Sequence, residues 1–222
     1  MTRKIILDVE TTGFKAIDGD KIVEIACIEL FDDKTLGKEF HYYINPKREI
    51  PRESTAIHNI TNEMVADKPT FAEIAGSLVE FIGNSKIIAH NANFDKGFIN
   101  HELNLANFPM FANEQFIDTL VLAKNKFPTL KNSLDALASR FNISLKSREG
   151  GHGALIDIKL LAEVYKNLIN DQITSLDDLI NKKSDINIVY NTLHTNKPAL
   201  LPNKEDISAH NDMLKKYGFK EF

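Results

Sequence analysis

Cysteine is almost missing from this sequence: Cys27 is the only one among 222 residues, and there is no tryptophan. A single cysteine excludes an intramolecular disulfide, and its apolar surroundings indicate a buried small side chain. No apolar run approaches the ~20 residues of a membrane-spanning helix. The first apolar run is interrupted by Asp8, too early for a signal peptide. We therefore expect a cytoplasmic protein.

An excess of positive charge is also missing. The chain has 27 lysine and arginine residues against 31 aspartate and glutamate residues, which gives a formal net charge of -4. This balance argues against a protein that holds nucleic acid tightly through a broad basic surface. It does not exclude a metal-dependent enzyme that acts on nucleic acid, because bound cations supply positive charge that the composition omits.

The composition does provide a core, since 43% of the residues are hydrophobic and 26% are charged, as is usual for globular proteins. The length fits one domain of about 170 residues with an appendage. The apolar patterns predict strands at 4–9, 21–30, 37–46 and 86–91, helices at 71–82, 93–105, 133–142 and 153–169, and a strand running into a helix at 115–123. This order predicts an α/β protein with a mixed sheet and helices on its faces.

The first strand carries two acids in "LDVETTGF", where Asp8 and Glu10 are separated only by Val9. Side chains of a strand alternate between its two faces, so both carboxylates must point to the same side of the sheet. Two like charges placed together cost free energy unless something positive lies between them. The pair therefore indicates a divalent metal site, although a solvated strand end is the alternative for these two residues alone.

Two later segments offer the missing ligands. Asp95 in "HNANFDK" lies at the start of a helix that follows a short strand, and Asp157 lies one turn into the helix "GALIDIKLLAEVYKNLI". His152 is a fifth candidate, but within one regular helix it would lie about 140° around the axis from Asp157. The glycines of "GGHGA" instead predict a loop that lets His152 fold back over the site.

The motifs "DVETTG", "HNANFD" and "HGALIDIKLLAEVY" resemble, in order and spacing, the three motifs of the DnaQ-like DEDDh exonucleases. Within that group the chain is most similar to the proofreading epsilon subunits of bacterial DNA polymerase III, because "FPTLKNSLDALASRF" and "EDISAHNDMLKKYG" are also shared. The resemblance covers nearly the whole chain. It implies a ribonuclease H-like fold, with a mixed five-stranded sheet and helices on both faces.

The resemblance also implies roles for the acidic residues. Asp8, Glu10 and Asp157 would hold one metal ion, Asp8 would bridge to a second, Asp95 would support that second site, and His152 would be the general base. Two cations roughly 3.5 to 4 Å apart suit phosphodiester hydrolysis because they activate water and relieve charge on the attacking and leaving oxygens. Oxygen ligands favour Mg²⁺ or Mn²⁺ over zinc. The implied activity is removal of mispaired 3′-terminal nucleotides from DNA.

Residues that contact the substrate follow from the same resemblance. The terminal nucleotide would meet the segment after the paired acids, the loop "AIHNIT" and the start of the helix at 93–105; the residues implied are Thr11, Thr12, Gly13, His58, Asn91 and Phe94. Phe94 has two interpretations, a stacking partner for an unpaired base or an ordinary core residue. His90 is interpreted as structural, and Asp118 as a helix cap in preference to a fifth ligand.

The last part of the chain is predicted to serve partners. After an exonuclease domain at 1–170, residues 171–186 are interpreted as a linker and 187–222 as the segment that binds the DNA polymerase III alpha subunit. "QITSL" in the linker is typical of peptides that bind the beta sliding clamp, through Gln172 and Leu176. A small accessory subunit is left open. Two alternatives remain: an exoribonuclease that trims RNA 3′ ends, and a noncatalytic scaffold.

Overall fold

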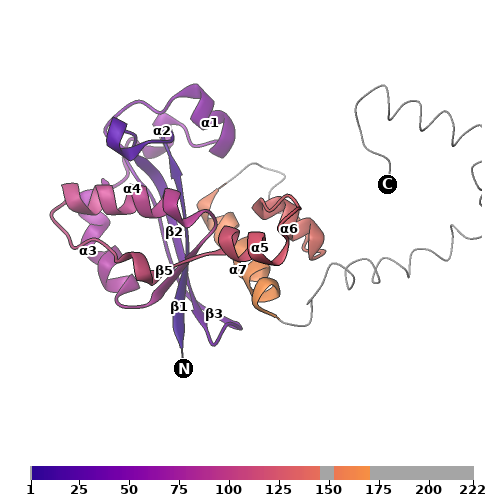
Figure 1. Cartoon of the computed structure of the whole chain (residues 1–222). Coiled ribbons are helices and arrows are strands. Elements are labelled where there is room, and N and C mark those ends of the chain that lie inside the picture. The colour runs from indigo at the N-terminus through magenta and orange to yellow at the C-terminus, as the bar shows by residue number, and fades with distance from the viewer. Residues whose placement is uncertain (1, 146–152, 171–222) are drawn as a thin grey trace, which may run out of the picture. The chain divides into compact units, whose positions relative to one another are not determined.

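The computed structural model describes residues 2–145 and 153–170, which form one mixed five-stranded sheet with helices on both sides (Figure 1). The strand order is β3-β2-β1-β4-β5. The strands are β1 (Arg3–Thr11), β2 (Ile22–Phe31), β3 (Thr35–Tyr43), β4 (Lys86–Ala89) and β5 (Phe116–Asp118). β1 is antiparallel to β2 and parallel to β4, so the prediction of a mixed five-stranded sheet is confirmed.

Seven α-helices connect and cover these strands within the described part of the chain. They are α1 (Arg52–His58), α2 (Asn62–Val65), α3 (Phe71–Ile82), α4 (Ala92–Leu105), α5 (Thr119–Lys126), α6 (Leu134–Arg140) and α7 (Ala154–Ile169). Two short 3₁₀ helices are also present: η1 (Ala16–Asp18) follows β1, and η2 (Asn113–Gln115) precedes β5. The predicted helix at 71–82 is confirmed without change. The short helices α1 and α2 were not predicted: between residues 46 and 71 only the loop "AIHNIT" was expected.

Alternation along β1 separates two apolar cores. Ile5 and Leu7 pack on the side of α3 and α4, whereas Ile6 packs on the side of α7. Figure 1 shows α3 and α4 on one side of the sheet and α5, α6 and α7 on the other. Because Asp8 and Glu10 have the phase of Ile6, their side chains leave β1 on the side of the sheet that α7 covers.

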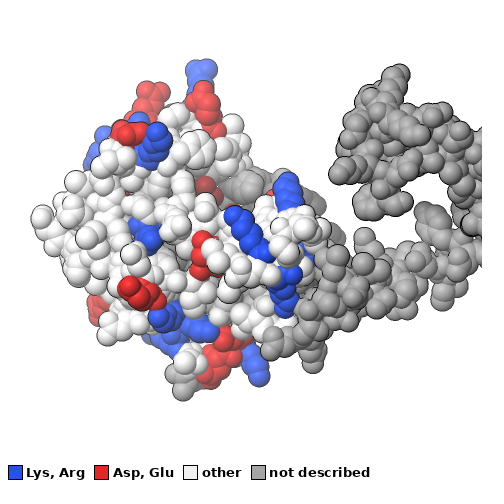
Figure 2. Space-filling view, in the orientation of Figure 1, with Lys and Arg blue, Asp and Glu red and all other residues white. Residues whose placement is uncertain are grey.

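The surface agrees with the composition. Figure 2 shows acidic and basic side chains interspersed on one face of this body, with uncharged residues over most of it. Among the helices of residues 2–145 and 153–170, none is long and apolar enough to cross a membrane.

Candidate active site

Three carboxylates meet where β1 ends and α7 begins. One oxygen each of Asp8, Glu10 and Asp157 lies within 4.8 Å of the other two. Asp8 and Glu10 are half-buried on β1, and Asp157, in the first turn of α7, is 6% exposed. Three acids held this closely in a partly dry site fit a hard divalent cation, because only oxygen ligands are offered. The structure thus brings together three of the four predicted acidic ligands.

The fourth acid, Asp95, is buried next to these three without joining their cluster. It lies in the first turn of α4 and is 3% exposed. The pKa of Asp95 is raised to about 8, chiefly by burial and in smaller part by the charge of Asp118, while backbone hydrogen bonds from its own N–H and from Val9 oppose the rise. A carboxyl group that is costly to ionise by itself is readily ionised by a nearby cation. This environment suits a supporting role beside a metal ion.

The predicted base, His152, lies outside the described residues. The chain is described again from Gly153, which has an extended backbone, and α7 begins with Ala154. The Asp157 N–H donates to the Gly153 carbonyl at 2.9 Å. The start of α7 therefore fixes both Asp157 and the point where the segment carrying His152 ends.

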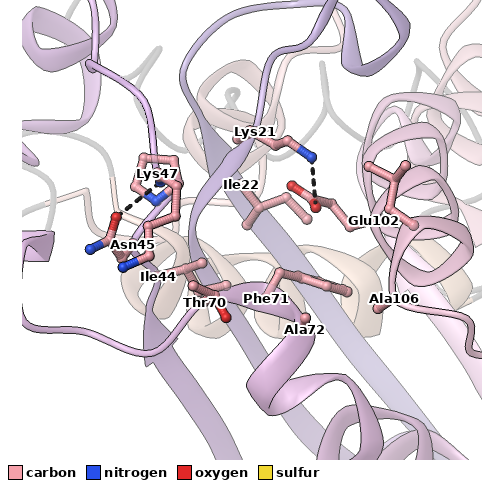
Figure 3. A pocket seen from close by; sticks show the side chains of 12 residues that line it. Lys21, Ile22, Ile44, Asn45, Lys47, Thr70, Phe71, Ala72, Glu102 and Ala106 are labelled. Atoms are coloured by element: carbon pink, nitrogen blue, oxygen red, sulfur yellow. Dashed lines mark hydrogen bonds and ion pairs between the residues drawn. The ribbon is translucent and has the colours of Figure 1, made fainter.

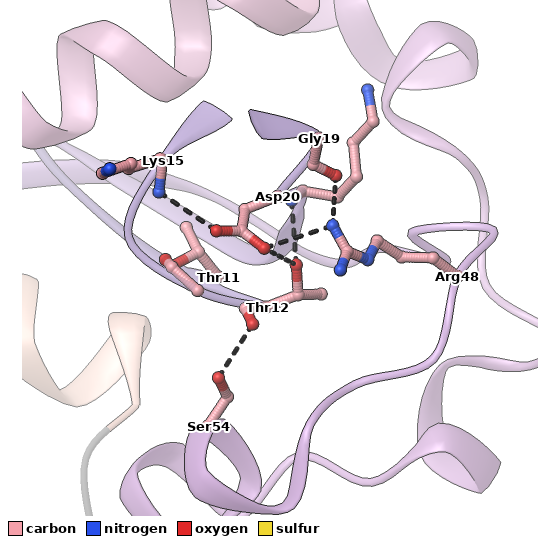
Figure 4. A network of polar contacts seen from close by, with 9 residues as sticks. Thr11, Thr12, Lys15, Gly19, Asp20, Arg48 and Ser54 are labelled. Atoms are coloured by element: carbon pink, nitrogen blue, oxygen red, sulfur yellow. Dashed lines mark hydrogen bonds and ion pairs between the residues drawn. The ribbon is translucent and has the colours of Figure 1, made fainter. Parts of the chain in front are cut away.

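The turn after the paired acids is tied to its surroundings by a polar network (Figure 4). Asp20 accepts hydrogen bonds from the Lys15 N–H at 3.1 Å and from Arg48 at 3.1 Å, and Arg48 also donates to the Gly19 carbonyl. The Thr12 hydroxyl accepts from the Lys21 N–H at 3.0 Å, and Ser54 donates to the Thr12 carbonyl at 2.9 Å.

This network leaves little room around the predicted substrate residues. A methyl group on Gly13 would lie 2.3 Å from a carboxylate oxygen of Asp20, so the position accepts only glycine without movement. The Thr11 hydroxyl donates to the Gly13 carbonyl at 2.6 Å. The hydroxyls of Thr11 and Thr12 are thus engaged within the turn, and Asp20 and Arg48 are structural members of the site that sequence patterns did not reveal.

His58 lies at the end of α1 and is 5% exposed. Its Nδ1 accepts a hydrogen bond from the Ile60 N–H at 3.0 Å, which requires the neutral ring to carry its proton on Nε2. Burial lowers the pKa of His58, although the backbone of Thr11 and the carboxylate of Glu24 lie close enough to oppose the shift. Nε2 makes no hydrogen bond of normal geometry to the described residues. His58 Nε2 is therefore a buried donor beside the Thr11 backbone, with no hydrogen bond of normal geometry in the described part of the protein.

A cavity of about 320 Å³ connects His58 with the start of α7. Its walls include Glu24 on β2, His41 and Tyr43 on β3, and Gly153. Glu24 is a buried acid that the sequence did not single out, although an acid inside the apolar segment "KIVEIACIEL" was a signal for it. A second cavity, between the start of α3 and the end of α4, contains the ion pair of Lys21 and Glu102 at 3.1 Å (Figure 3). That cavity is lined by neither Asp8, Glu10 nor Asp157.

The surroundings of Phe94 agree with both of its predicted interpretations. It packs against the first core with its ring centroid 4.9 Å from that of Phe98, and it also lines a surface cavity beside Phe14 and Ile17, whose side chains are 78% and 82% exposed. The neighbouring Asn91 begins α4 in an exposed, left-handed conformation. Phe94 directly precedes Asp95 in the first turn of α4.

Two structural roles are confirmed at the end of the sheet. Asp118 caps α5 by accepting from the Leu120 N–H at 2.9 Å, and it also accepts from the Asn91 N–H at 3.1 Å. His90 forms a hydrogen bond through Nδ1 with the Thr119 hydroxyl at 2.9 Å. Cys27 is fully buried, as predicted, and burial raises the pKa of its thiol. Gln172 and Leu176, which are predicted to bind the clamp, lie outside the described residues.

Comparison with known proteins agrees with this geometry. The family described as Exonuclease (RNase_T) matches residues 5–165. DNA polymerase III subunit epsilon of Rickettsia conorii is 42% identical over 220 residues, which cover 96% of this chain and 95% of the relative.

Solved structures give the same result for the fold. Exonuclease X in complex with 5′ overhanging duplex DNA is 28% identical with a TM-score of 0.59, and the match covers 82% of this chain and 98% of that one. The nuclease domain of 3′hExo, a DEDDh family member bound to rAMP, is 16% identical with a TM-score of 0.65, over 76% of this chain and 92% of that one. The exonuclease prediction is confirmed: the chain belongs to the Exonuclease family and, within it, to the DNA polymerase III epsilon subunits.

Proposed function

We propose that the chain is the proofreading subunit of a DNA polymerase III and removes mispaired 3′-terminal nucleotides by two-metal-ion hydrolysis. The observation that carries this proposal is the meeting of Asp8, Glu10 and Asp157 within 4.8 Å on one side of the sheet. Two bound Mg²⁺ or Mn²⁺ ions would supply an activated water and relieve charge on the reacting oxygens. Water adds to phosphorus, and the bond to the 3′ oxygen of the preceding nucleotide breaks. That oxygen takes up a proton, and the terminal nucleotide leaves as a nucleoside 5′-monophosphate.

The protein's own groups have distinct parts in this reaction. Asp8, Glu10 and Asp157 would hold the metal ions, and Asp95 would support the second of them. His152 would take the proton of the attacking water in its neutral form, which a histidine does well near neutral pH. The buried Nε2–H of His58, which makes no hydrogen bond of normal geometry to the described residues, supports its proposed contact with an oxygen of the terminal nucleotide.

The turn and Phe94 would orient the strand. Thr11, Thr12 and Gly13 would meet the nucleotide chiefly through their backbone, because the two hydroxyls are already bonded. Phe94, next to Asn91, would stack on an unpaired base, and stacking accepts any base sequence. A frayed end would then be preferred over a paired one, as proofreading requires.

The proposed partners follow from this role. The substrate would be a single-stranded or frayed DNA 3′ end, presented by the polymerase alpha subunit that binds residues 187–222, while Gln172 and Leu176 would contact the beta sliding clamp. The formal net charge of -4 supports a subunit that is brought to DNA by its partner. Such a complex works where the bacterial chromosome is copied, in the cytoplasm.

Two other functions are less well supported. An exoribonuclease would need the same acids, because hydrolysis at phosphorus does not depend on the sugar, but the relative at 42% identity is a DNA polymerase subunit. A noncatalytic scaffold would have no need for the three acids that converge here. DNA proofreading is therefore the better proposal.

The direct test is digestion of a 5′-labelled DNA primer that has a matched or mismatched 3′ end, with Mg²⁺ or chelator, beside an RNA control. We expect a metal-dependent ladder that shortens from the 3′ end, faster on the mismatch and weak on RNA. A ladder confined to RNA would establish the exoribonuclease alternative instead, and no ladder would contradict both enzymes.

Asp8→Asn tests the site itself. We expect cleavage to fall about 1,000-fold or more, because a metal ligand stabilises the transition state by several kcal/mol. The melting temperature without metal should stay equal or rise, since the change removes one charge from a crowded acidic cluster. Asp67→Asn is the matched control because Asp67 is exposed and pairs with Lys68 at 2.9 Å. Retained cleavage in a folded Asp8→Asn protein would contradict the assignment.

A further inference from the structure

Glu24 is a buried acid that the reaction described above does not use. It lies on β2 and is 2% exposed. Both of its oxygens have partners: Oε1 accepts from His41 Nε2 at 2.7 Å, and Oε2 accepts from the Ala154 N–H at 3.0 Å. Burying a carboxylate costs free energy unless it is well paired. The almost complete burial of Glu24 therefore indicates that its two hydrogen bonds have a function.

Its position in the sheet puts this carboxylate at the active site. Glu24 lies directly opposite Glu10 in the antiparallel pair of β1 and β2. Residues opposite each other in such a pair project from the same face of the sheet. Glu24 therefore leaves the sheet beside Glu10, on the side that α7 covers, and reaches the first residue of that helix.

The start of α7 has no cap of its own. Gly153 precedes the helix and has no side chain to accept a hydrogen bond from the first free N–H groups. A carboxylate at a helix N-terminus satisfies such a group and interacts favourably with the helix dipole. Glu24 supplies this carboxylate from a different element of the fold.

Gly153 and Ala154, at the start of α7, connect Glu24 to Asp157. Glu24 holds the N–H of Ala154, and the carbonyl of the adjacent Gly153 accepts from the Asp157 N–H at 2.9 Å. A shift of Gly153 and Ala154 would therefore move Asp157 relative to Asp8 and Glu10. We propose that Glu24, held in place by His41, is a positioning residue that sets where α7 begins and so brings Asp157 into the metal site.

This inference rests on the proposed function, because it assigns Glu24 to the geometry of the same metal site. His41 fixes the carboxylate by its hydrogen bond, and its ring packs edge-on against Tyr43 with the centroids 5.2 Å apart. The alternative is that Glu24 stabilises the fold in general, like any well-paired buried acid. The two interpretations differ in whether metal binding depends on Glu24 beyond its effect on stability.

Glu29 provides a matched control on the same strand. It accepts from the Lys38 N–H at 2.8 Å and from Arg3 at 2.7 Å, so it also joins one backbone N–H and one basic side chain. It does not belong to the acidic cluster. Glu24→Ala and Glu29→Ala thus remove the same kind of pairing from two ends of β2, one next to the proposed metal site and one away from it.

The experiment measures melting temperature in chelator, the upward shift that Mn²⁺ produces, and kcat and KM on a single-stranded DNA oligonucleotide. For Glu24→Ala we expect kcat to fall and the Mn²⁺ concentration for a half-maximal melting shift to rise, each by about 10-fold to 100-fold, as when a group that orients metal ligands is lost. KM for DNA should change little. For Glu29→Ala we expect a lower melting temperature in chelator with an unchanged response to Mn²⁺.

Equal Mn²⁺ responses in the two folded alanine variants would overturn the positioning role. If Glu24→Ala does not fold, Glu24→Gln decides, because its amide oxygen can still accept from Ala154 and support the fold. The neutral side chain nevertheless loses the carboxylate's charge at the start of α7 and the charge-assisted bond to His41. We then expect a folded protein with a weakened Mn²⁺ response, and an unchanged response would overturn the proposal. Failure of the proposed function would look different: wild-type protein would show no metal-dependent cleavage, whereas the melting shift tests the position of Glu24 without any cleavage.

Discussion

His58 couples protonation to folding at a single residue. Burial lowers the pKa of its ring, and its Nδ1 must stay unprotonated to accept from the Ile60 N–H. In the unfolded chain, His58 has a pKa near 6.5. Below that pH the unfolded state therefore binds a proton that the folded state resists. The free energy of unfolding should therefore fall on acidification below about pH 6.5 and be insensitive to this group above it.

His58→Asn should flatten this part of the pH profile, because an asparagine oxygen can replace Nδ1 as acceptor but does not titrate. Urea unfolding in chelator at pH 5.5, 6.5 and 7.5 would measure the difference. His101→Asn on α4 serves as the control for replacing a histidine as such. A wild-type profile with the same slope as that of His58→Asn would show that the buried ring does not resist protonation.

At the scale of elements, the turn between β1 and β2 should act as one unit. Gly13→Ala would drive a methyl group into Asp20, and Asp20→Ala would release the bonds to Lys15 and Arg48. Either change displaces the backbone that is proposed to meet the nucleotide. We expect each to lower kcat/KM by about 10-fold to 100-fold, the scale of a small misplacement of substrate.

The double variant distinguishes a unit from two separate contacts. Once Asp20 is alanine, the methyl group on Gly13 has no carboxylate to meet, so the second change should cost much less than it does alone. Measuring kcat/KM on a short oligonucleotide in all four proteins tests this. Fully additive losses would mean that Gly13 and Asp20 act independently.

Sequence patterns predicted the long elements and the acids, for physical reasons that particular residues illustrate. The helix expected at 153–169 is α7, Ala154–Ile169, because its apolar stripe spans several turns. α1 and α2 have seven and four residues, too few for a periodic signal. Alternation placed Asp8 and Glu10 on one face, and the later acids Asp95 and Asp157 then indicated a metal site. Glu24 was not singled out, because its partners lie 17 and 130 residues away and only the folded sheet brings them together.

At the scale of the whole molecule, the described residues support a separation along the chain between catalysis and partner binding. α7 ends at Ile169, and Lys126 on α5 donates to the carbonyls of Leu168 and Asn170 at 3.1 and 3.2 Å. All three converging acids and both apolar cores lie before residue 171. The described residues 2–145 and 153–170 thus hold the three converging acids and both cores.

Truncation after Asn170 tests this separation. We expect the shortened chain to hydrolyse single-stranded DNA at a rate within about 3-fold of the full chain, because no group of the acidic cluster is removed. It should no longer co-elute with the polymerase alpha subunit in size-exclusion chromatography. A chain ending at residue 186 keeps Gln172 and Leu176 and should bind the clamp but not the polymerase. An inactive 1–170 chain would mean that residues after 170 are needed for activity. A 1–170 chain that still co-elutes with the polymerase would mean that the binding surface lies before residue 171.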